Sequence, residues 1–212
     1  MKFLLFSKIS FEVSDPVALV ESYCFQSNFY ANYDFLSDKD VNKIGARIER
    51  KLLPKCEAIT KNTKNLYIFE YDLDGFLKLN KKTRNYHIKK LNQRTIKKLL
   101  EIKGIGLSRA TKVLHTLYPK IIPMIDKALQ EEYRKEINPR WMEEQSDQIL
   151  IDYYDNLRED DNLQHLTQIL DSISKNNLVG LTKVRIFDIL WWSFLKSKKL
   201  RQEGNIDWST IK

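Results

Sequence analysis

Two features of this sequence could do chemistry, and they lie close together. The first is a glycine turn, Lys103-Gly104-Ile105-Gly106, and the second is a single aspartate, Asp126, twenty residues after Gly106. Backbone N–H groups at the start of a helix that follows such a turn can hold a phosphate group. A carboxylate placed beside that phosphate could stabilise a developing positive charge or orient a water molecule.

Helical patterns flank the turn and must position both features. A helix with Asn92 as its N-cap would end at Gly104 with positive φ, and a second helix would begin near Leu107. Gly106 has no side chain, so the backbone there can approach another molecule closely. The pattern is equally typical of a plain helical hairpin. The predicted inner face of the second helix carries Ala110, Val113, Leu114 and Leu117.

Length and composition predict a mostly α protein, a multi-helical bundle that forms a single domain over residues 1–212, in one or two lobes. The chain has 212 residues, 42% of them apolar, with only six Gly and five Pro. Residues 2–13 favour a short β segment or an extended arm. Residues 182–200 are apolar on every side, which is typical of a buried helix. Within it, Trp191 and Trp192 are interpreted as core residues, and Arg185 with Asp188 as a surface pair or a buried bond.

The charge of the chain is positive and unevenly distributed. The net charge is +8; residues 77–99 hold nine bases and no acid, whereas residues 130–161 hold eleven acids and four bases. Each run could be a solvated helix face, but the basic run adjoins the glycine turn, which favours a phosphate-facing surface. The predicted basic patch consists of Lys81, Lys82, Arg84, Lys89 and Lys90.

Cysteine and histidine usage argues against a metal or a disulfide framework. Cys24 and Cys56 are too few for a four-thiolate zinc site or an iron–sulfur cluster, and His87, His115 and His165 have no metal-ligand spacing. No apolar stretch is long enough to span a membrane. We therefore expect a cytoplasmic protein with reduced thiols, no metal and no membrane partner.

The turn resembles the hairpin of helix-hairpin-helix proteins, in which an apolar-x-Gly-apolar-Gly sequence is followed four positions later by a small residue. Ile102, Gly104, Ile105, Gly106 and Ala110 match that form. In the DNA glycosylases of this superfamily (HhH-GPD), a loop after the second helix ends in a catalytic aspartate, and here residues 123–126, Pro-Met-Ile-Asp, have that spacing. The form is most similar to the adenine glycosylase branch, and the resemblance covers a core of about residues 92–129.

The resemblance implies a DNA glycosylase in which Asp126 stabilises the cation-like sugar as the base leaves. It implies a double-stranded DNA partner, a monomer and no cofactor, although a monovalent cation at the hairpin is compatible with it. Members that also cut the strand carry a lysine two residues after the second glycine, where this chain has Ser108, so base release without strand cleavage is expected. The residues expected to bind the DNA backbone are Lys103, Gly104, Ile105, Gly106, Ser108, Arg109 and Lys112.

Structural alternatives remain open for each of these residues. Asp126 could simply cap a helix that begins at Lys127, and Ser108 could be a first-turn residue. Residues 184–192 resemble the end of an uncharacterised family of helix-hairpin-helix proteins, which is compatible with lost chemistry. The alternatives are therefore a non-catalytic DNA-binding module and a helical protein-interaction protein. DNA affinity that falls steeply with added salt would exclude the interaction protein.

Overall fold

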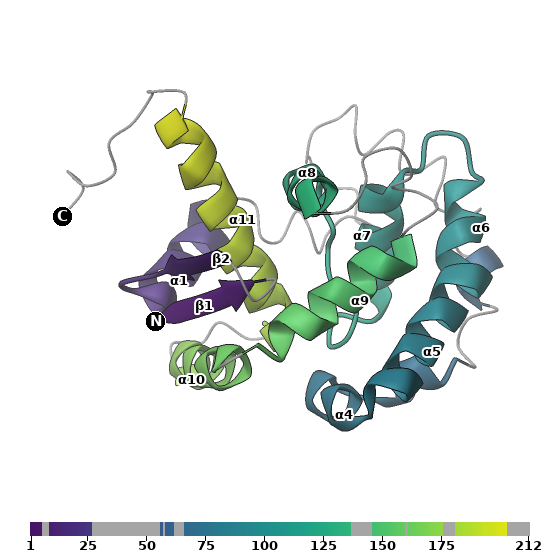
Figure 1. The fold of residues 1–212 in the computed structure, drawn as a ribbon, viewed down its shortest axis with the longest axis horizontal. Helices are drawn as coiled ribbons and strands as arrows, with labels where there is room; N and C mark the ends of the chain where they lie inside the picture. Colours follow the sequence, from purple (N-terminus) through teal and green to yellow (C-terminus); the bar gives the residue numbers. More distant parts are fainter. Residues whose placement is uncertain are drawn as a thin grey trace.

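The structure is a computed structural model that describes residues 1–5, 9–26, 56, 58–61, 66–136, 146–159, 161–175 and 181–202. Among these residues it is mostly helical, with a two-stranded sheet near the N-terminus, which confirms the predicted fold class (Figure 1). Strands β1 (Lys2–Leu5) and β2 (Ile9–Glu12) pair antiparallel, and the rings of Phe3 and Phe11 stack at 5.2 Å. The β-leaning N-terminal segment therefore forms paired strands.

A continuous helical run leads into the glycine turn. It consists of α5 (Lys81–Leu91), the π-helical turn η3 (Asn92–Ile96) and α6 (Lys97–Leu100). The prediction that Asn92 caps a helix is wrong, because Asn80 caps this run by accepting the Thr83 N–H at 2.9 Å. The Asn92 side chain is buried instead, and its Oδ1 accepts a hydrogen bond from the Ser146 hydroxyl at 2.6 Å.

The other described helices complete the bundle. They are α1 (Pro16–Gln26), the short 3₁₀ helix η2 (Tyr67–Glu70), α4 (Leu73–Lys78), α7 (Leu107–Leu117), α8 (Lys127–Glu136), α9 (Ser146–Leu157), α10 (Asn162–Lys175) and α11 (Lys183–Gln202). The predicted inner face of α7 holds for Ala110, Val113 and Leu114, which are buried, but Leu117 is 45% exposed. None of the described helices is both long and apolar enough to cross a membrane.

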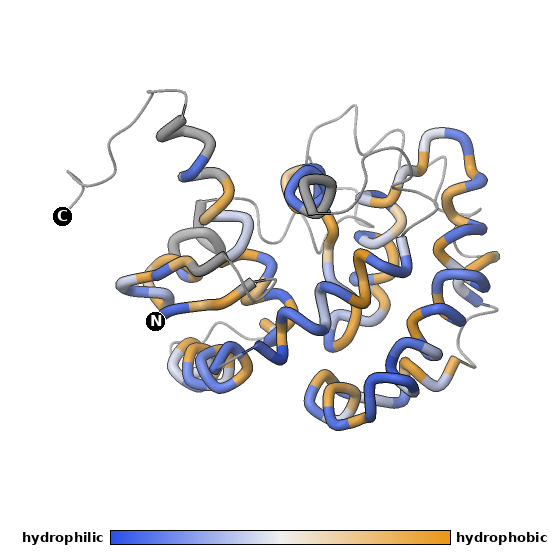
Figure 2. Tube along the Cα trace, viewed as in Figure 1, coloured by the Kyte–Doolittle hydropathy of each residue, from blue (hydrophilic) through white to orange (hydrophobic). Residues whose placement is uncertain are grey.

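The helices form two groups around one connected core. In Figure 1, β1, β2, α1, α10 and α11 gather on one side, α4 to α7 on the other, and α8 and α9 lie between them. Figure 2 shows apolar residues along the middle of α11 and many polar residues along α5 and α6. One buried cluster includes residues of both groups, from Phe3 to Trp191.

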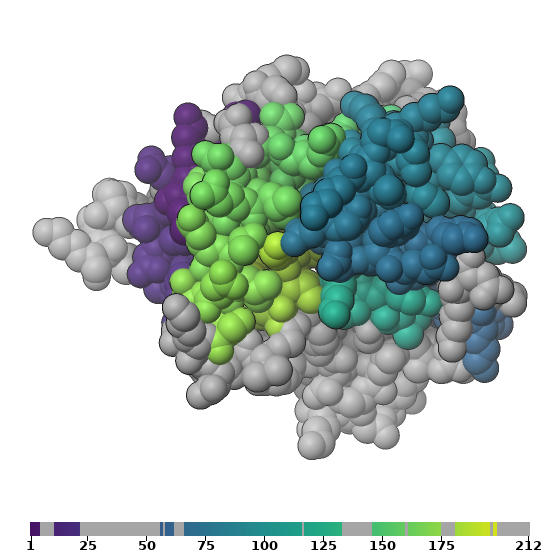
Figure 3. Space-filling model, turned by 90° about the horizontal axis from the view of Figure 1, so that it is seen from below, coloured from purple at the N-terminus to yellow at the C-terminus, as the bar shows by residue number. Residues whose placement is uncertain are grey.

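An ion pair also joins the two groups. Figure 3 shows the start of α11 at the surface, between the segments of α10 and of α4 and α5. There Lys183 pairs with Asp74 of α4 at 2.7 Å. The beginning of α11 is therefore fixed against the helices that carry the basic run.

Candidate functional site

The loop between α7 and α8 is held by side chains from other helices, beginning with its carbonyl groups. The Thr182 hydroxyl donates to the Pro119 carbonyl oxygen at 2.8 Å, and the Tyr154 hydroxyl donates to that of Ile121 at 2.5 Å. His115 of α7 donates from Nδ1 to the next carbonyl, at residue 122, and burial lowers the pKa of this histidine to about 4. The imidazole is therefore neutral and acts as a structural donor.

The amide groups of the same loop are fixed in the same way. The Met124 N–H donates to Asp188 Oδ2 of α11 at 2.9 Å, and the Ile125 N–H donates to Thr111 Oγ1 of α7 at 3.1 Å. Both bonds are buried. The backbone just before Asp126 is therefore held by two helices that lie far apart in sequence, which is the kind of support that a precise site requires.

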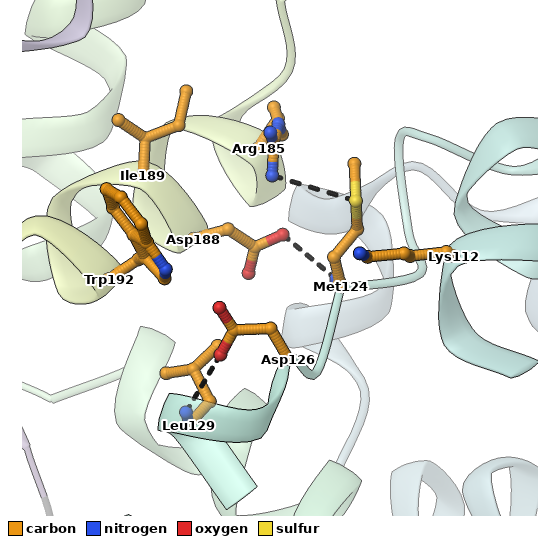
Figure 4. A pocket seen from close by; sticks show the side chains of 8 residues that line it. All are labelled: Lys112, Met124, Asp126, Leu129, Arg185, Asp188, Ile189 and Trp192. Atoms are coloured by element: carbon orange, nitrogen blue, oxygen red, sulfur yellow. Dashed lines mark hydrogen bonds between the residues drawn. The ribbon is translucent and has the colours of Figure 1, made fainter. Parts of the chain in front are cut away.

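Asp126 lies at the junction of this loop and α8 and has two roles in the structure. Its Oδ1 accepts the Leu129 N–H at 2.9 Å, so the helix cap considered above is confirmed. The side chain is half-buried and also lines a cavity, with its second oxygen directed toward Asp188 (Figure 4). The capping role therefore leaves one carboxylate oxygen facing open space.

The cavity is small, and half of its lining residues are charged. Its volume is about 160 Å³. A cavity of ~150 Å³ can hold benzene, so there is room for one aromatic ring. Two carboxyl groups, one lysine and one arginine share the wall with apolar side chains, which is the composition of a binding site. The lining residues are Lys112, Met124, Asp126, Leu129, Arg185, Asp188, Ile189 and Trp192.

Asp188 is the most perturbed acid of this site. It is 2% exposed, and its Oδ1 accepts the Tyr153 hydroxyl at 2.7 Å. Burial, together with the charge of Asp126, raises the pKa of Asp188 to about 7. The Arg185 charge and the hydrogen bonds from Met124 N–H and the Tyr153 hydroxyl oppose that rise. Asp188 can therefore carry a proton near neutral pH.

This raised pKa predicts a change in stability with pH. The folded state binds the Asp188 proton more tightly than the unfolded chain, so the stabilisation is complete below about pH 4 and is lost as pH rises toward 7. Asp188→Asn keeps the shape and removes the titration. We expect the unfolding free energy of wild type to fall relative to this variant by up to ~1.4 kcal/mol per pH unit in that window. Urea titrations at several pH values measure the difference, and a constant difference would contradict the raised pKa.

The glycine turn has the geometry that the sequence predicts at Gly104, where φ is 94°. Its interior is closed by its own bonds. The Arg109 guanidinium donates to the Gly104 carbonyl oxygen, and the Ile105 N–H donates to that of Ile102 at 2.9 Å. Ile105 is also buried and its N–H is used within the turn, so we do not include it among the groups proposed to hold a phosphate. A monovalent cation at these carbonyls would compete with Arg109, and we assign no step to one.

The start of α7 has open space beside Gly106 and no side-chain cap. Its first helical bonds run from the Arg109 and Ala110 N–H groups to the Gly106 carbonyl oxygen, both at 3.0 Å. No side chain caps the helix at Gly106. A Cβ atom at Gly106 would meet nothing within 4 Å, so the space beside it is open. The N–H groups of Leu107 and Ser108, which precede the first helical bonds, are therefore the ones suited to an anion.

The predicted basic patch is smaller than expected. Lys82 and Lys89 are exposed on α5, and the Lys90 ammonium lies 5.4 Å from the centre of the Tyr86 ring. Lys81 is exposed but pairs with Asp155 at 2.9 Å. The assignment of Arg84 to this surface is wrong, because its side chain is buried.

Arg84 is a structural residue. Its side chain is 1% exposed and binds Asp155 of α9 at 3.0 Å. It also donates to the Leu79 carbonyl oxygen at 2.7 Å. A charged group so deeply buried must be paired, and here the partner comes from the acidic run. The exposed cations of this surface are therefore lysines.

The remaining predicted cations divide between the turn and the cavity. Lys103 is exposed in the turn, whereas Lys112, one helical turn or ~6 Å further along α7 than Ser108, lines the cavity. Lys112 therefore lies deeper than a backbone-contacting residue was expected to lie. Lys112 therefore belongs to the same helix as the Leu107 and Ser108 N–H groups and to the same cavity wall as Asp126.

The sequence interpretation did not assign Asp188 to the site and favoured a core position for Trp192. Trp191 is buried in the core as expected, but Trp192 lines the cavity. A signal was present, since Arg185 and Asp188 are charged residues three positions apart in the otherwise apolar stretch of residues 184–192. Buried charges need polar partners, so such a pair indicates a site or a buried network.

Comparison of the chain with protein-family models, curated proteins and solved structures found no match. Among the described residues, no group of three His, Cys, Asp or Glu side chains could hold a metal ion. The function must therefore be inferred from the geometry of the site itself.

Proposed function

We propose that this chain binds duplex DNA through the turn between α6 and α7 and hydrolyses the N-glycosidic bond of a damaged or modified base. The observation that carries the proposal is the position of Asp126. It stands on the wall of a ring-sized cavity, and it is fixed there by a loop that begins at the end of α7. The resemblance to helix-hairpin-helix DNA glycosylases supports the same function.

The proposed contact with the DNA backbone is made by the start of α7 and the charged residues near it. The outward N–H groups near Gly106 would hold a phosphate without reading a base. Lys103 in the turn and Lys82 and Lys89 on the preceding run add positive charge on exposed positions. Such contacts give affinity that falls as salt is added.

The chemistry follows from the cavity. A base taken out of the duplex would enter the cavity, as enzymes that act on bases require. The free oxygen of Asp126 would face the sugar as the bond to the base breaks, and its negative charge would stabilise the positive charge on the sugar. Because Ser108 offers no amine, we expect an intact strand with an abasic site as product.

A non-catalytic DNA-binding module is the second candidate. The observation in its favour is that Asp126 caps α8, which would explain the residue without any chemistry. It does not account for the second carboxyl group, Asp188, on the same cavity wall.

The test is a panel of duplex oligonucleotides, each with one altered base, incubated with the protein and then treated with alkali. The proposed enzyme produces alkali-labile sites on at least one duplex and no strand break before alkali. Binding to duplex DNA without any such site across the panel would favour the second candidate. The lack of salt-sensitive duplex binding would contradict both.

Gly106→Asp is expected to weaken DNA binding by about tenfold, or ~1.4 kcal/mol, without loss of stability. The new carboxylate has open space, and Gly106 already has extended backbone angles, φ −95° and ψ 178°, that any residue adopts. An aspartate there would cap α7 and cover the amides with negative charge. Fluorescence anisotropy with a labelled duplex measures the affinity, and thermal unfolding measures the stability.

Gln164→Glu on α10 is the matched control for charge. Gln164 is exposed, and α10 lies on the other side of the fold from the turn (Figure 1). This variant should bind DNA nearly as wild type does. If Gly106→Asp binds as tightly as Gln164→Glu, the turn is not the phosphate site.

A further inference from the structure

Two carboxyl groups face each other across the cavity, Asp126 from the loop and Asp188 from α11 (Figure 4). The two oxygens of Asp188 differ in their surroundings. Oδ2 accepts the Met124 N–H at 2.9 Å, whereas Oδ1 accepts the Tyr153 hydroxyl at 2.7 Å. Oδ2 therefore anchors the side chain, and Oδ1 is the oxygen whose bonding can change.

The proton of a neutral Asp188 belongs on Oδ1, because Oδ2 already faces the hydrogen of a backbone N–H. The Tyr153 hydroxyl has a second acceptor, the Val184 carbonyl oxygen at 3.2 Å, and can direct its own hydrogen there. Oδ1 is then free to hold a proton. Both the charged and the neutral form of Asp188 therefore fit the same arrangement of side chains.

We propose that Asp188 donates a proton to the departing base, while Asp126 stabilises the positive charge on the sugar. The assignment rests on the proposed function, since it requires a base in the cavity. It also names a substrate class, namely electrically neutral bases. A neutral base leaves poorly as an anion, so a positioned proton donor accelerates its departure.

The step balances with water as the only other reactant. The bond between the sugar C1′ and the base nitrogen breaks, and its electron pair stays on the base. The base takes the proton from Asp188 Oδ1. Water adds to C1′ and gives one proton to the Asp188 carboxylate, which restores the acid. The products are the neutral free base and an abasic sugar.

The charged and titratable groups around Asp188 separate the roles of the two acids. Arg185 lies on its own helix, Asp126 on the loop, Lys112 on α7, and Tyr153 and Tyr154 on α9. Burial raises the pKa of Asp188 to about 7, close to the pH at which a proton donor works best. The two acids stand in different surroundings, since Asp188 is buried and Asp126 is half-buried, so they can take different roles.

The experiment compares wild type and Asp188→Asn on two duplexes that differ in one base. One carries a neutral base that wild type releases, and the other carries 3-methylcytosine, a single-ring base that is positively charged and leaves without gaining a proton. We expect Asp188→Asn to slow release of the neutral base about 100-fold or more. Asp171→Asn, an exposed aspartate on α10, is the control and should release both bases as wild type does.

The pH profile gives the second readout. The rate of wild type on the neutral base should fall as pH rises above about 7, because the acid form of Asp188 is lost. Tyr153→Phe removes a donor that favours the charged form, so the fall should move to higher pH. This variant tests the proposal even if Asp188→Asn does not fold, because an unmoved profile overturns it.

The outcomes separate this inference from the proposed function. If wild type releases no base from any duplex, the proposed function fails. If wild type releases a neutral base and Asp188→Asn does so equally fast, the function stands and the role of Asp188 is wrong. Release of 3-methylcytosine alone by wild type also leaves the function standing and overturns the substrate class.

Discussion

Asp126→Asn is expected to slow base release by roughly 100- to 1000-fold while leaving the fold intact. An asparagine oxygen can still accept the Leu129 N–H, and asparagine is as good a helix cap as aspartate. The substitution therefore keeps the helix and removes only the negative charge that faces the cavity. Single-turnover rates on the duplex that wild type attacks measure the loss, and thermal unfolding verifies the fold.

Asp15→Asn is the matched control for this prediction. Asp15 also caps a helix, with its Oδ1 accepting the Ala18 N–H at 2.9 Å, but it stands before α1 and lines no part of the cavity. Both variants should have nearly the stability of wild type, and only Asp126→Asn should lose activity. If the two variants release base equally fast, Asp126 is a cap and nothing more.

The charge of Asp126 also acts on its neighbour. Asp126 contributes to the raised pKa of Asp188, so its removal should lower the pKa of Asp188 and weaken the proton donor. Asp126→Asn should therefore slow base release in two ways. The positive charge on the sugar loses its stabilising carboxylate, and the departing base has a weaker proton donor. In the double variant with Asp188→Asn, the two losses should not add in free energy, as expected for groups that act on one step.

The sequence predicts the local features of this site well. Gly104 needs positive φ, α7 begins next to Gly106, and Asp126 stands directly before α8. Each of these depends on a few neighbouring residues, such as a glycine that ends one helix or an acid that caps another. Local rules of this kind leave a clear pattern in a short stretch of sequence.

The other half of the site depends on contacts between distant segments. Asp188 binds the Met124 N–H across 64 positions of sequence, and Tyr154 binds the Ile121 carbonyl oxygen across 33. Periodicity places Asp188 on a buried helix but cannot say which backbone group it meets. Asn92 is a different case, because its role as a cap failed on a local signal: Asn80 caps an earlier and longer helical run. Only the partner of the buried Asn92 side chain, Ser146, is set by a contact across 54 positions of sequence.

Asp155→Ala is expected to lower the unfolding free energy by about 3 kcal/mol. The variant leaves the Arg84 guanidinium, 1% exposed, without its carboxylate partner. The estimate is at the lower end for a broken buried pair, because Asp155 itself is 28% exposed. Guanidinium chloride unfolding followed by tryptophan fluorescence measures the loss.

Lys81→Ala tests whether this loss belongs to Arg84. Lys81 binds the same carboxylate at 2.9 Å but is 67% exposed, and exposed pairs contribute less than ~1 kcal/mol. If Asp155→Ala lowers the unfolding free energy no more than Lys81→Ala does, Arg84 is not held by its ion pair. If Asp155→Ala lowers the unfolding free energy clearly more than Lys81→Ala does, the ion pair of Arg84 stabilises the packing of α5 against α9. Under the proposed function, the cations left on α5 to contact DNA would then be exposed lysines such as Lys82 and Lys89.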